Sequence, residues 1–152
     1  MLKKIFLFIL CLVPWFISSL FPVDYNYYES LNLPFFAPPS IFYGIVWPIV
    51  YILIALNVSS LFNTYKFKDI PWTYKITLLI NYIFNQSYII VAFLLKNNFL
   101  GFVSCLGTFI SGLFLYEETY QLKSEKIKLL LPYLALSLFA SILSLTIYFL
   151  NI

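Results

Sequence analysis

The chain has 152 residues, of which 62% are hydrophobic, 22% aromatic and only 10% charged, and its formal net charge is +3. A soluble domain is about 45–50% apolar and about a quarter charged, so this chain has too few polar side chains to cover a soluble surface. Intrinsic disorder is also excluded because it requires low hydrophobicity, and the composition therefore predicts an integral membrane protein.

Five apolar blocks follow one another along the chain, at about residues 5–20, 41–62, 76–95, 99–116 and 127–150. A bilayer span needs roughly 20 apolar residues, so the blocks have the length of transmembrane segments. We expect α-helices, because in hydrocarbon the backbone polar groups must be satisfied within each segment. Strands of a membrane barrel would instead alternate in polarity. The sequence thus predicts one all-α domain over residues 1–152, a bundle of five transmembrane helices.

The block at 5–20 also has features of a secretory signal peptide. Two lysines, Lys3 and Lys4, precede its apolar run, which is the order of a signal peptide's basic and apolar regions. However, Pro14 is followed by bulky Trp15 and Phe16, and no small-residue cleavage site is evident. We predict that the first helix is retained; cleavage would leave a bundle of four spans.

The first loop, between the blocks at 5–20 and 41–62, contains Pro34, Pro38 and Pro39 among aromatic residues. Prolines stiffen the backbone and disfavour helix in the residues before them. We expect a rigid apolar segment that lies over the mouth of the bundle as a lid. The alternative is an interfacial aromatic belt, since Trp and Tyr gather at that depth of the membrane.

The third block carries a polar face formed by Asn81, Asn85, Tyr88 and Ala92, which share one side of a helix. Carboxamides in hydrocarbon are costly unless they are paired, so we expect this face to point into the bundle. Two interpretations remain open from the residues alone. The face either forms hydrogen bonds between helices or is the wall of a ligand cavity.

The fourth and fifth blocks carry stripes of small or polar residues, which favour close helix contact within a monomer or between protomers. These stripes are Gly101, Ser104, Thr108, Ser111 and Gly112, and Tyr133, Ser137, Ser141, Ser144 and Tyr148. No block has a charged residue near its centre, which argues against an ion-coupled transporter.

The lysines are distributed unevenly between the two sides of the predicted bundle. One side receives the N-terminus and the second and fourth loops, which carry Lys3, Lys4, Lys66, Lys68, Lys75, Lys123, Lys126 and Lys128. The other side has only Lys96. Excess positive charge marks the cytoplasmic side, so we expect the N-terminus inside and the first loop outside. No basic and aromatic surface motif indicates a nucleic acid partner.

Residue usage offers little for catalysis or metal binding. The chain has no histidine, and Cys11 and Cys105 lie in separate apolar blocks, without redox-pair spacing or enough ligands for zinc. We predict no catalytic residue, no metal site and no required cofactor. The abundance of lysine, isoleucine and asparagine is typical of A/T-rich coding and favours a bacterial cell membrane, with a eukaryotic organelle as the alternative.

Three groups of residues have the spacing of one membrane-protein family. They are Tyr27, Tyr28, Leu31, Pro34, Phe36, Pro38, Pro39, Tyr43, Gly44, Trp47 and Tyr51; Asn85 and Tyr88; and Pro132, Tyr133, Leu134, Ala135, Leu136, Phe139, Ala140 and Ser144. In these positions the chain resembles the TspO/MBR family of tryptophan-rich sensory proteins, which includes the mitochondrial translocator protein. Three motif tryptophans of that family are replaced here, by Phe36, Tyr88 and Leu136.

The resemblance implies a homodimer in the lipid bilayer that binds porphyrins or similar flat hydrophobic ligands between its helices, under the first loop. Carried over position by position, the ligand-binding wall comprises Phe36, Trp47, Tyr51, Asn85, Tyr88, Leu136 and Ala140, beneath a loop lid with Pro34, Pro38 and Pro39. Porphyrin or haem would be a ligand of this wall and not a required cofactor.

The function predicted from this resemblance is a membrane receptor or carrier for tetrapyrroles or other flat lipophilic molecules. Two alternatives stand beside it: a porphyrin-degrading enzyme, and a structural or partner-binding membrane subunit without a ligand. The tryptophans replaced at Tyr88 and Leu136, together with the absence of an acid–base pair, count against the enzyme.

Overall fold

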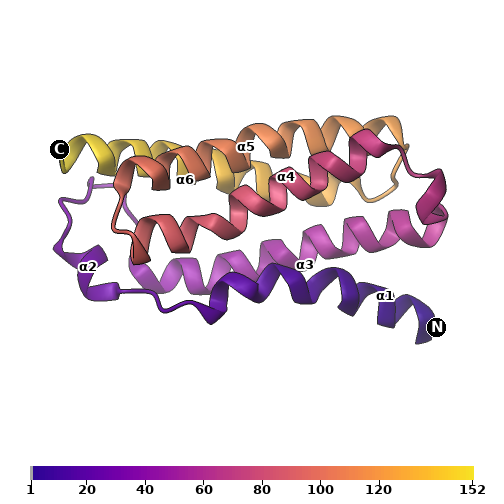
Figure 1. The fold of residues 1–152 in the computed structure, drawn as a ribbon, viewed down its shortest axis with the longest axis horizontal. Coiled ribbons are helices and arrows are strands. Elements are labelled where there is room, and N and C mark those ends of the chain that lie inside the picture. The colour runs from indigo at the N-terminus through magenta and orange to yellow at the C-terminus, as the bar shows by residue number, and fades with distance from the viewer. Residues whose placement is uncertain (1) are drawn as a thin grey trace.

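The computed structural model describes residues 2–152, and five long helical segments make up most of them (Figure 1). They are α1 (Leu2–Leu12) continued by the 3-10 helix η1 (Val13–Leu20), α3 (Ser40–Thr64), α4 (Trp72–Ile89) continued by the π-helix η3 (Ile90–Leu94), α5 (Asn98–Gln121), and the 3-10 helix η4 (Ile127–Leu130) continued by α6 (Leu131–Leu150). The short helices α2 (Tyr25–Ser30) and η2 (Phe67–Asp69) lie in connections.

Each of these five segments is long and apolar enough to cross a membrane. Residues 2–152 contain no β-strand, so the prediction of an all-α bundle with five transmembrane helices is confirmed. The ends agree within a few residues, except that α5 continues to Gln121, past the predicted end at 116. Hydropathy marks where the apolar span ends, whereas the helix itself continues through the polar residues Glu117 and Glu118.

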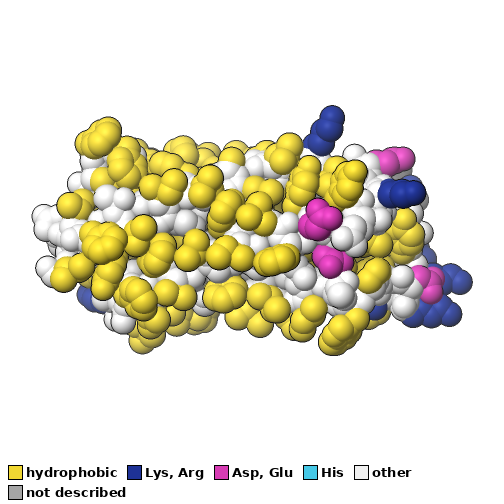
Figure 2. Space-filling view, turned by 90° about the horizontal axis from the view of Figure 1, so that it is seen from above, with side chains coloured by type: hydrophobic (Ala, Val, Ile, Leu, Met, Phe, Trp, Pro, Cys, Tyr) yellow, Lys and Arg dark blue, Asp and Glu magenta, His cyan; other side chains and the backbone are white. Residues whose placement is uncertain are grey.

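The segments run side by side in an up-and-down bundle (Figure 1). The N-terminal end of α1 and the α3–α4 and α5–α6 connections lie at one end, and α2, the α4–α5 turn and the C-terminus lie at the other. Figure 2 shows hydrophobic side chains along the length of one face, with charged side chains gathered toward one end. This distribution fits an integral membrane protein, with the lysine-rich segments on one side of the bilayer.

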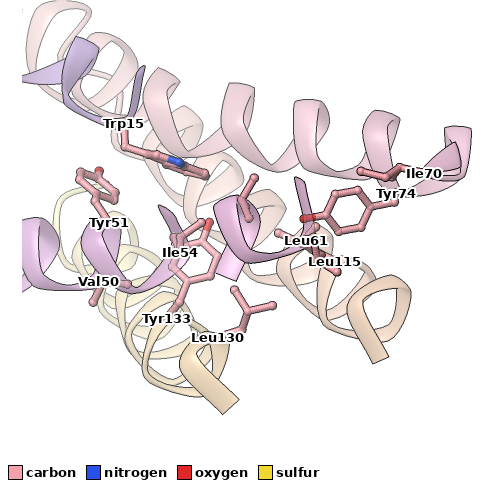
Figure 3. Packing of buried hydrophobic residues seen from close by; sticks show 11 residues of the cluster. Trp15, Val50, Tyr51, Ile54, Leu61, Ile70, Tyr74, Leu115, Leu130 and Tyr133 are labelled. Atoms are coloured by element: carbon pink, nitrogen blue, oxygen red, sulfur yellow. The ribbon is translucent and has the colours of Figure 1, made fainter. Parts of the chain in front are cut away.

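The core of the bundle is built around Trp15, which is only 3% exposed. Its indole stacks on Tyr51 of α3, with ring centroids 5.6 Å apart, and meets Tyr82 of α4 edge-on at 5.4 Å. Figure 3 shows Trp15 with Ile54 and Tyr133 in the same cluster. Each aromatic pair adds about 0.5–1.5 kcal/mol beyond area burial. The first helical segment is therefore part of the packed bundle.

The glycines of α5 let this helix approach its neighbours within the same chain. A Cβ atom at Gly107 would overlap the ring of Phe84 on α4, and one at Gly112 would lie 3.0 Å from a methyl group of Leu134 on α6. Such close backbone approach is the usual role of small residues between membrane helices. The small-residue face of α5 therefore packs inside the monomer.

Gly107→Ala is expected to destabilise the folded protein by about 1–3 kcal/mol, because the added methyl group overpacks the contact with Phe84. Gly44→Ala is the matched control, since a Cβ atom at this helical glycine meets nothing within 4 Å. Alanine's better helix propensity should leave the control unchanged or stabilise it by up to about 1 kcal/mol. Thermal unfolding in detergent measures both variants. Equal melting temperatures would contradict the tight α4–α5 contact.

Candidate functional site

A cavity of about 300 Å³ lies between the helices at the α2 end of the bundle. Five of the predicted ligand-binding residues line it: Trp47 and Tyr51 from α3, Asn85 and Tyr88 from α4, and Ala140 from α6. Side chains of η1, α2, η3 and α5, together with Val23, also line it. Residues far apart in the sequence are thus brought together around one hollow.

Two of the predicted wall residues, Phe36 and Leu136, are not among the residues that line this cavity. Phe36 packs edge-on against Phe139 of α6, with ring centroids 6.4 Å apart. Leu136 packs against the core cluster that contains Trp15. It precedes Ala140 by four residues, about 6 Å along the helix axis, and so belongs to the solid layer next to the cavity.

The cover of the cavity comes from α2 and from Val23, two residues before it. Val23, Tyr25 and Tyr28 line the hollow. The prolines predicted as the lid lie outside its wall: Pro34, Pro38 and Pro39. The helix α2 was not predicted, although Asp24 carried a signal for it. Its carboxylate accepts the Tyr27 backbone N–H over 2.9 Å, which is the usual role of aspartate at a helix N-cap.

Asn85 receives two hydrogen bonds at the cavity wall. Tyr51 Oη donates to Asn85 Oδ1 over 3.0 Å, and Gln86 Nε2 donates to the same oxygen over 2.9 Å. Gln86 also accepts the backbone N–H of Ser18 over 2.8 Å and donates to the carbonyl of Trp15 over 3.2 Å. Sequence reasoning missed Gln86. The available signal was a carboxamide in an apolar block, which is costly to bury without partners.

Asn81, one turn before Asn85 on α4, has a different role. It is fully buried, its Nδ2 donates to the Thr108 carbonyl over 2.9 Å and to Ser111 Oγ over 3.0 Å, and its Oδ1 accepts Tyr133 Oη over 2.8 Å. The two asparagines on the polar face of α4 therefore lie in different surroundings. Asn81 joins helices, whereas Asn85 lies at the cavity.

The cavity wall is aromatic and uncharged. The rings of Trp47 and Tyr51 lie 5.7 Å apart and are tilted by 38°. On the α5–α6 side, Cys105 Sγ lies 3.3 Å from Ser144 Oγ. Among the described residues that line the cavity, none is Asp, Glu, Lys, Arg or His. This arrangement suits a neutral aromatic molecule that stacks on rings and forms a few oriented hydrogen bonds.

Exposed polar contacts fasten the cover to the rest of the bundle. Asp24 forms an ion pair with Lys96 in the α4–α5 turn at 3.0 Å, and Tyr27 Oη donates to the Lys96 carbonyl over 3.3 Å. Farther along the loop, the Asn32 backbone N–H donates to Asn151 Oδ1 over 2.9 Å. The Tyr27 N–H bond and the Lys96 ammonium hold the pKa of Asp24 below its usual range. This ion pair is therefore intact at neutral pH and is lost only when acid protonates Asp24.

A sequence model of the TspO/MBR family matches residues 6–150. The chain belongs to this family. Over 150 residues it is 40% identical to the tryptophan-rich protein TspO of Bacillus cereus, covering 98% of this chain and 97% of that protein. It is 35% identical over 133 residues to the uncharacterized membrane protein YtaB of Bacillus subtilis, covering 88% and 85%. It is 30% identical over 128 residues to tryptophan-rich protein TspO of Archaeoglobus fulgidus, covering 83% and 80%.

The three tryptophan replacements in this TspO/MBR chain have unequal consequences for the cavity. Only Tyr88 lines the hollow, whereas Phe36 and Leu136 lie in packed clusters beside it. The retained Trp47 gives the wall an indole ring, with Tyr51 next to it. The aromatic character of the cavity therefore survives these replacements.

Asp24→Asn is expected to speed the entry of a cavity ligand by about two- to fivefold, because it removes an exposed ion pair between the cover and the α4–α5 turn. Asparagine is also a good N-cap residue, so α2 itself should persist. Stopped-flow fluorescence with a porphyrin at neutral pH measures the entry rate. Asp69→Asn, at the opposite end of the bundle, is the control. Equal entry rates in the wild type and Asp24→Asn would show that this contact does not limit access.

Proposed function

We propose that this TspO/MBR protein binds flat lipophilic molecules, porphyrins among them, and acts as a membrane receptor or carrier for them. The observation that carries the proposal is the cavity of about 300 Å³, with the rings of Trp47, Tyr51 and Tyr88 and the amide of Asn85 in its wall. Small-molecule sites have volumes of about 300–1,000 Å³ and are mostly apolar, with few oriented polar groups. The cavity lies at the small end of that range.

Stacking on the wall is the main source of affinity in this proposal. Each offset or edge-on contact between aromatic rings contributes about 0.5–1.5 kcal/mol beyond area burial. The wall has no cation to neutralise a carboxylate, and burying an unpaired charge is costly. A porphyrin in this site therefore keeps its propionate groups toward the α2 end, where Lys96 and water are close.

The structural-subunit alternative has one observation in its favour, the complete pairing of Asn81 between helices. The same explanation does not extend to Asn85, which lies at an open hollow, and receptor function accounts for both residues. Porphyrin degradation has less support, because the described wall has no carboxylate or imidazole for acid–base catalysis.

Titration of the purified protein with protoporphyrin is expected to quench its tryptophan fluorescence to saturation. Trp47→Leu should weaken binding by roughly tenfold, because it removes one stacking ring from the wall. Trp72→Leu is the matched control, since Trp72 is 73% exposed at the start of α4 and outside the cavity. A flat titration with folded wild-type protein would contradict the receptor proposal. Equal affinities in the two variants would favour the structural subunit.

We also propose that the protein is a homodimer in a bacterial cell membrane, with its N-terminus in the cytoplasm. Two of the relatives are bacterial proteins. The end of the bundle that holds the N-terminal segment carries all the lysines except Lys96, and positive charge favours the cytoplasmic side. Symmetric dimers are the commonest oligomers, and the mass of the detergent-solubilised particle tests the dimer directly.

Orientation is tested by labelling single cysteines in intact bacterial cells, after Cys11 and Cys105 are replaced by serine. Lys96→Cys is expected to react with a membrane-impermeant maleimide, because the α4–α5 turn is on the outer side in this proposal. Lys66→Cys, in the α3–α4 connection, should react only after the cells are opened. The reverse pattern would show that the bundle is inserted the other way round.

A further inference from the structure

Gln86 lies behind the cavity wall and binds the backbone of η1. It is not a lining residue and is only 9% exposed. Its Oε1 accepts the Ser18 N–H over 2.8 Å, and its Nε2 donates to the Trp15 carbonyl over 3.2 Å. These backbone groups are three residues apart, the spacing that a hydrogen bond of a 3-10 helix joins. A backbone N–H only donates and a carbonyl only accepts. The backbone of η1 therefore requires the Gln86 oxygen to face the Ser18 N–H and the Gln86 nitrogen to face the Trp15 carbonyl.

The orientation of Gln86 then determines the orientation of Asn85. The second N–H of Gln86 Nε2 donates to Asn85 over 2.9 Å, so the Asn85 atom that faces it has to be the oxygen. Tyr51 Oη donates to the same oxygen over 3.0 Å. Both lone pairs of Asn85 Oδ1 are therefore used inside the protein, and the amide is held in one of its two orientations.

The Nδ2 group of Asn85 remains for the cavity. It makes no hydrogen bond of ordinary length to another residue in the part of the chain that the structure describes, although the Tyr133 hydroxyl lies near it. In residues 2–152, the side-chain N and O atoms that are fully buried and lack a hydrogen-bond partner belong to Asn57 and Tyr74. Asn85 Nδ2 is not among them, so protein atoms do not enclose it completely. Asn85 lines the hollow, so its two N–H groups are donors available to a molecule inside it.

We infer that Gln86 is a specificity-determining positioning residue, which holds Asn85 as a hydrogen-bond donor toward the cavity and so selects flat ligands that present an uncharged acceptor atom to it. This inference rests on the proposed function, since it concerns the ligand of the same cavity. The uncharged wall excludes a buried carboxylate as the acceptor. The selected class is instead a neutral aromatic carbonyl compound or a heterocycle with an accepting nitrogen.

Three tricyclic probes of nearly the same shape separate acceptor, donor and apolar ligands: 9-fluorenone has a carbonyl, carbazole has an N–H, and fluorene has neither. Equilibrium dialysis against detergent micelles, with protein-free micelles as the blank, measures their affinities. The wild type is expected to bind fluorenone about tenfold more tightly than carbazole, because a donor facing the Asn85 N–H groups leaves buried polar groups unpaired. Fluorenone should also bind more tightly than fluorene.

Gln86→Met keeps the length of the side chain and removes its amide. Without that amide the Asn85 side chain is free to turn over, since the Tyr51 hydroxyl can donate or accept, and the preference for fluorenone over carbazole is expected to shrink to about twofold or less. Fluorene affinity should not change, whereas collapse of the cavity would lower all three affinities. Gln121→Met, the same change at an exposed glutamine at the end of α5, should keep the wild-type preference.

The wild-type measurement decides the inference even if Gln86→Met does not fold. Binding of fluorene without a preference for fluorenone over carbazole would overturn the role of Gln86 and leave the receptor proposal standing. An undiminished preference in folded Gln86→Met would also overturn it. If neither the three probes nor protoporphyrin bind to folded protein, the proposed function fails, and this inference fails with it.

Discussion

A carboxamide in hydrocarbon has to find a hydrogen-bond partner, and α4 carries three carboxamides within two turns. Asn81 binds α5 and α6, Asn85 binds Tyr51 of α3, and Gln86 binds the backbone of η1. The helix α4 is thus joined by a side-chain amide to each of the other four long segments. An unpaired buried polar group costs about 1–3 kcal/mol, so each bond penalises displacement of one neighbour relative to α4. This requirement sets the arrangement around the cavity.

Regular helix geometry also stops at the cavity, where α4 continues as the π-helix η3. The Leu95 N–H bonds to the Ile90 carbonyl five residues back, over 2.9 Å. A wider turn changes which side chains share a face, so Phe93 lines the hollow with Tyr88, at a ring separation of 6.1 Å. In a regular α-helix Ala92 would share a face with Tyr88, four residues earlier, but it is absent from that wall. Short π segments inside helices are frequent at functional sites, and here one adds an aromatic ring to the wall.

The sequence was sufficient for those features that depend on local composition or on a regular period. Apolar length predicted the five spans, and the helical repeat placed Asn85 and Tyr88 on an inward face. Prediction failed where a tertiary contact decides the outcome: Gln86 is explained only once η1 lies against α4. Motif spacing also does not encode how deep a side chain lies along the bundle. It therefore could not show that Phe36 and Leu136 fill packed layers beside the hollow.

The two ends of the cavity differ in the contacts that hold the surrounding segments together. On the inner side, the amides are paired in a medium without water, and their loss exposes unsatisfied polar groups. At the α2 end, the cover is held by contacts such as Asp24 with Lys96, which lie in water and contribute little because water competes for both partners. Local opening follows the weakest set of contacts, so α2 opens before the helices separate. In the proposed receptor, a ligand would therefore enter beside the cover and meet the Asn85 amide last, after its rings have stacked on the wall.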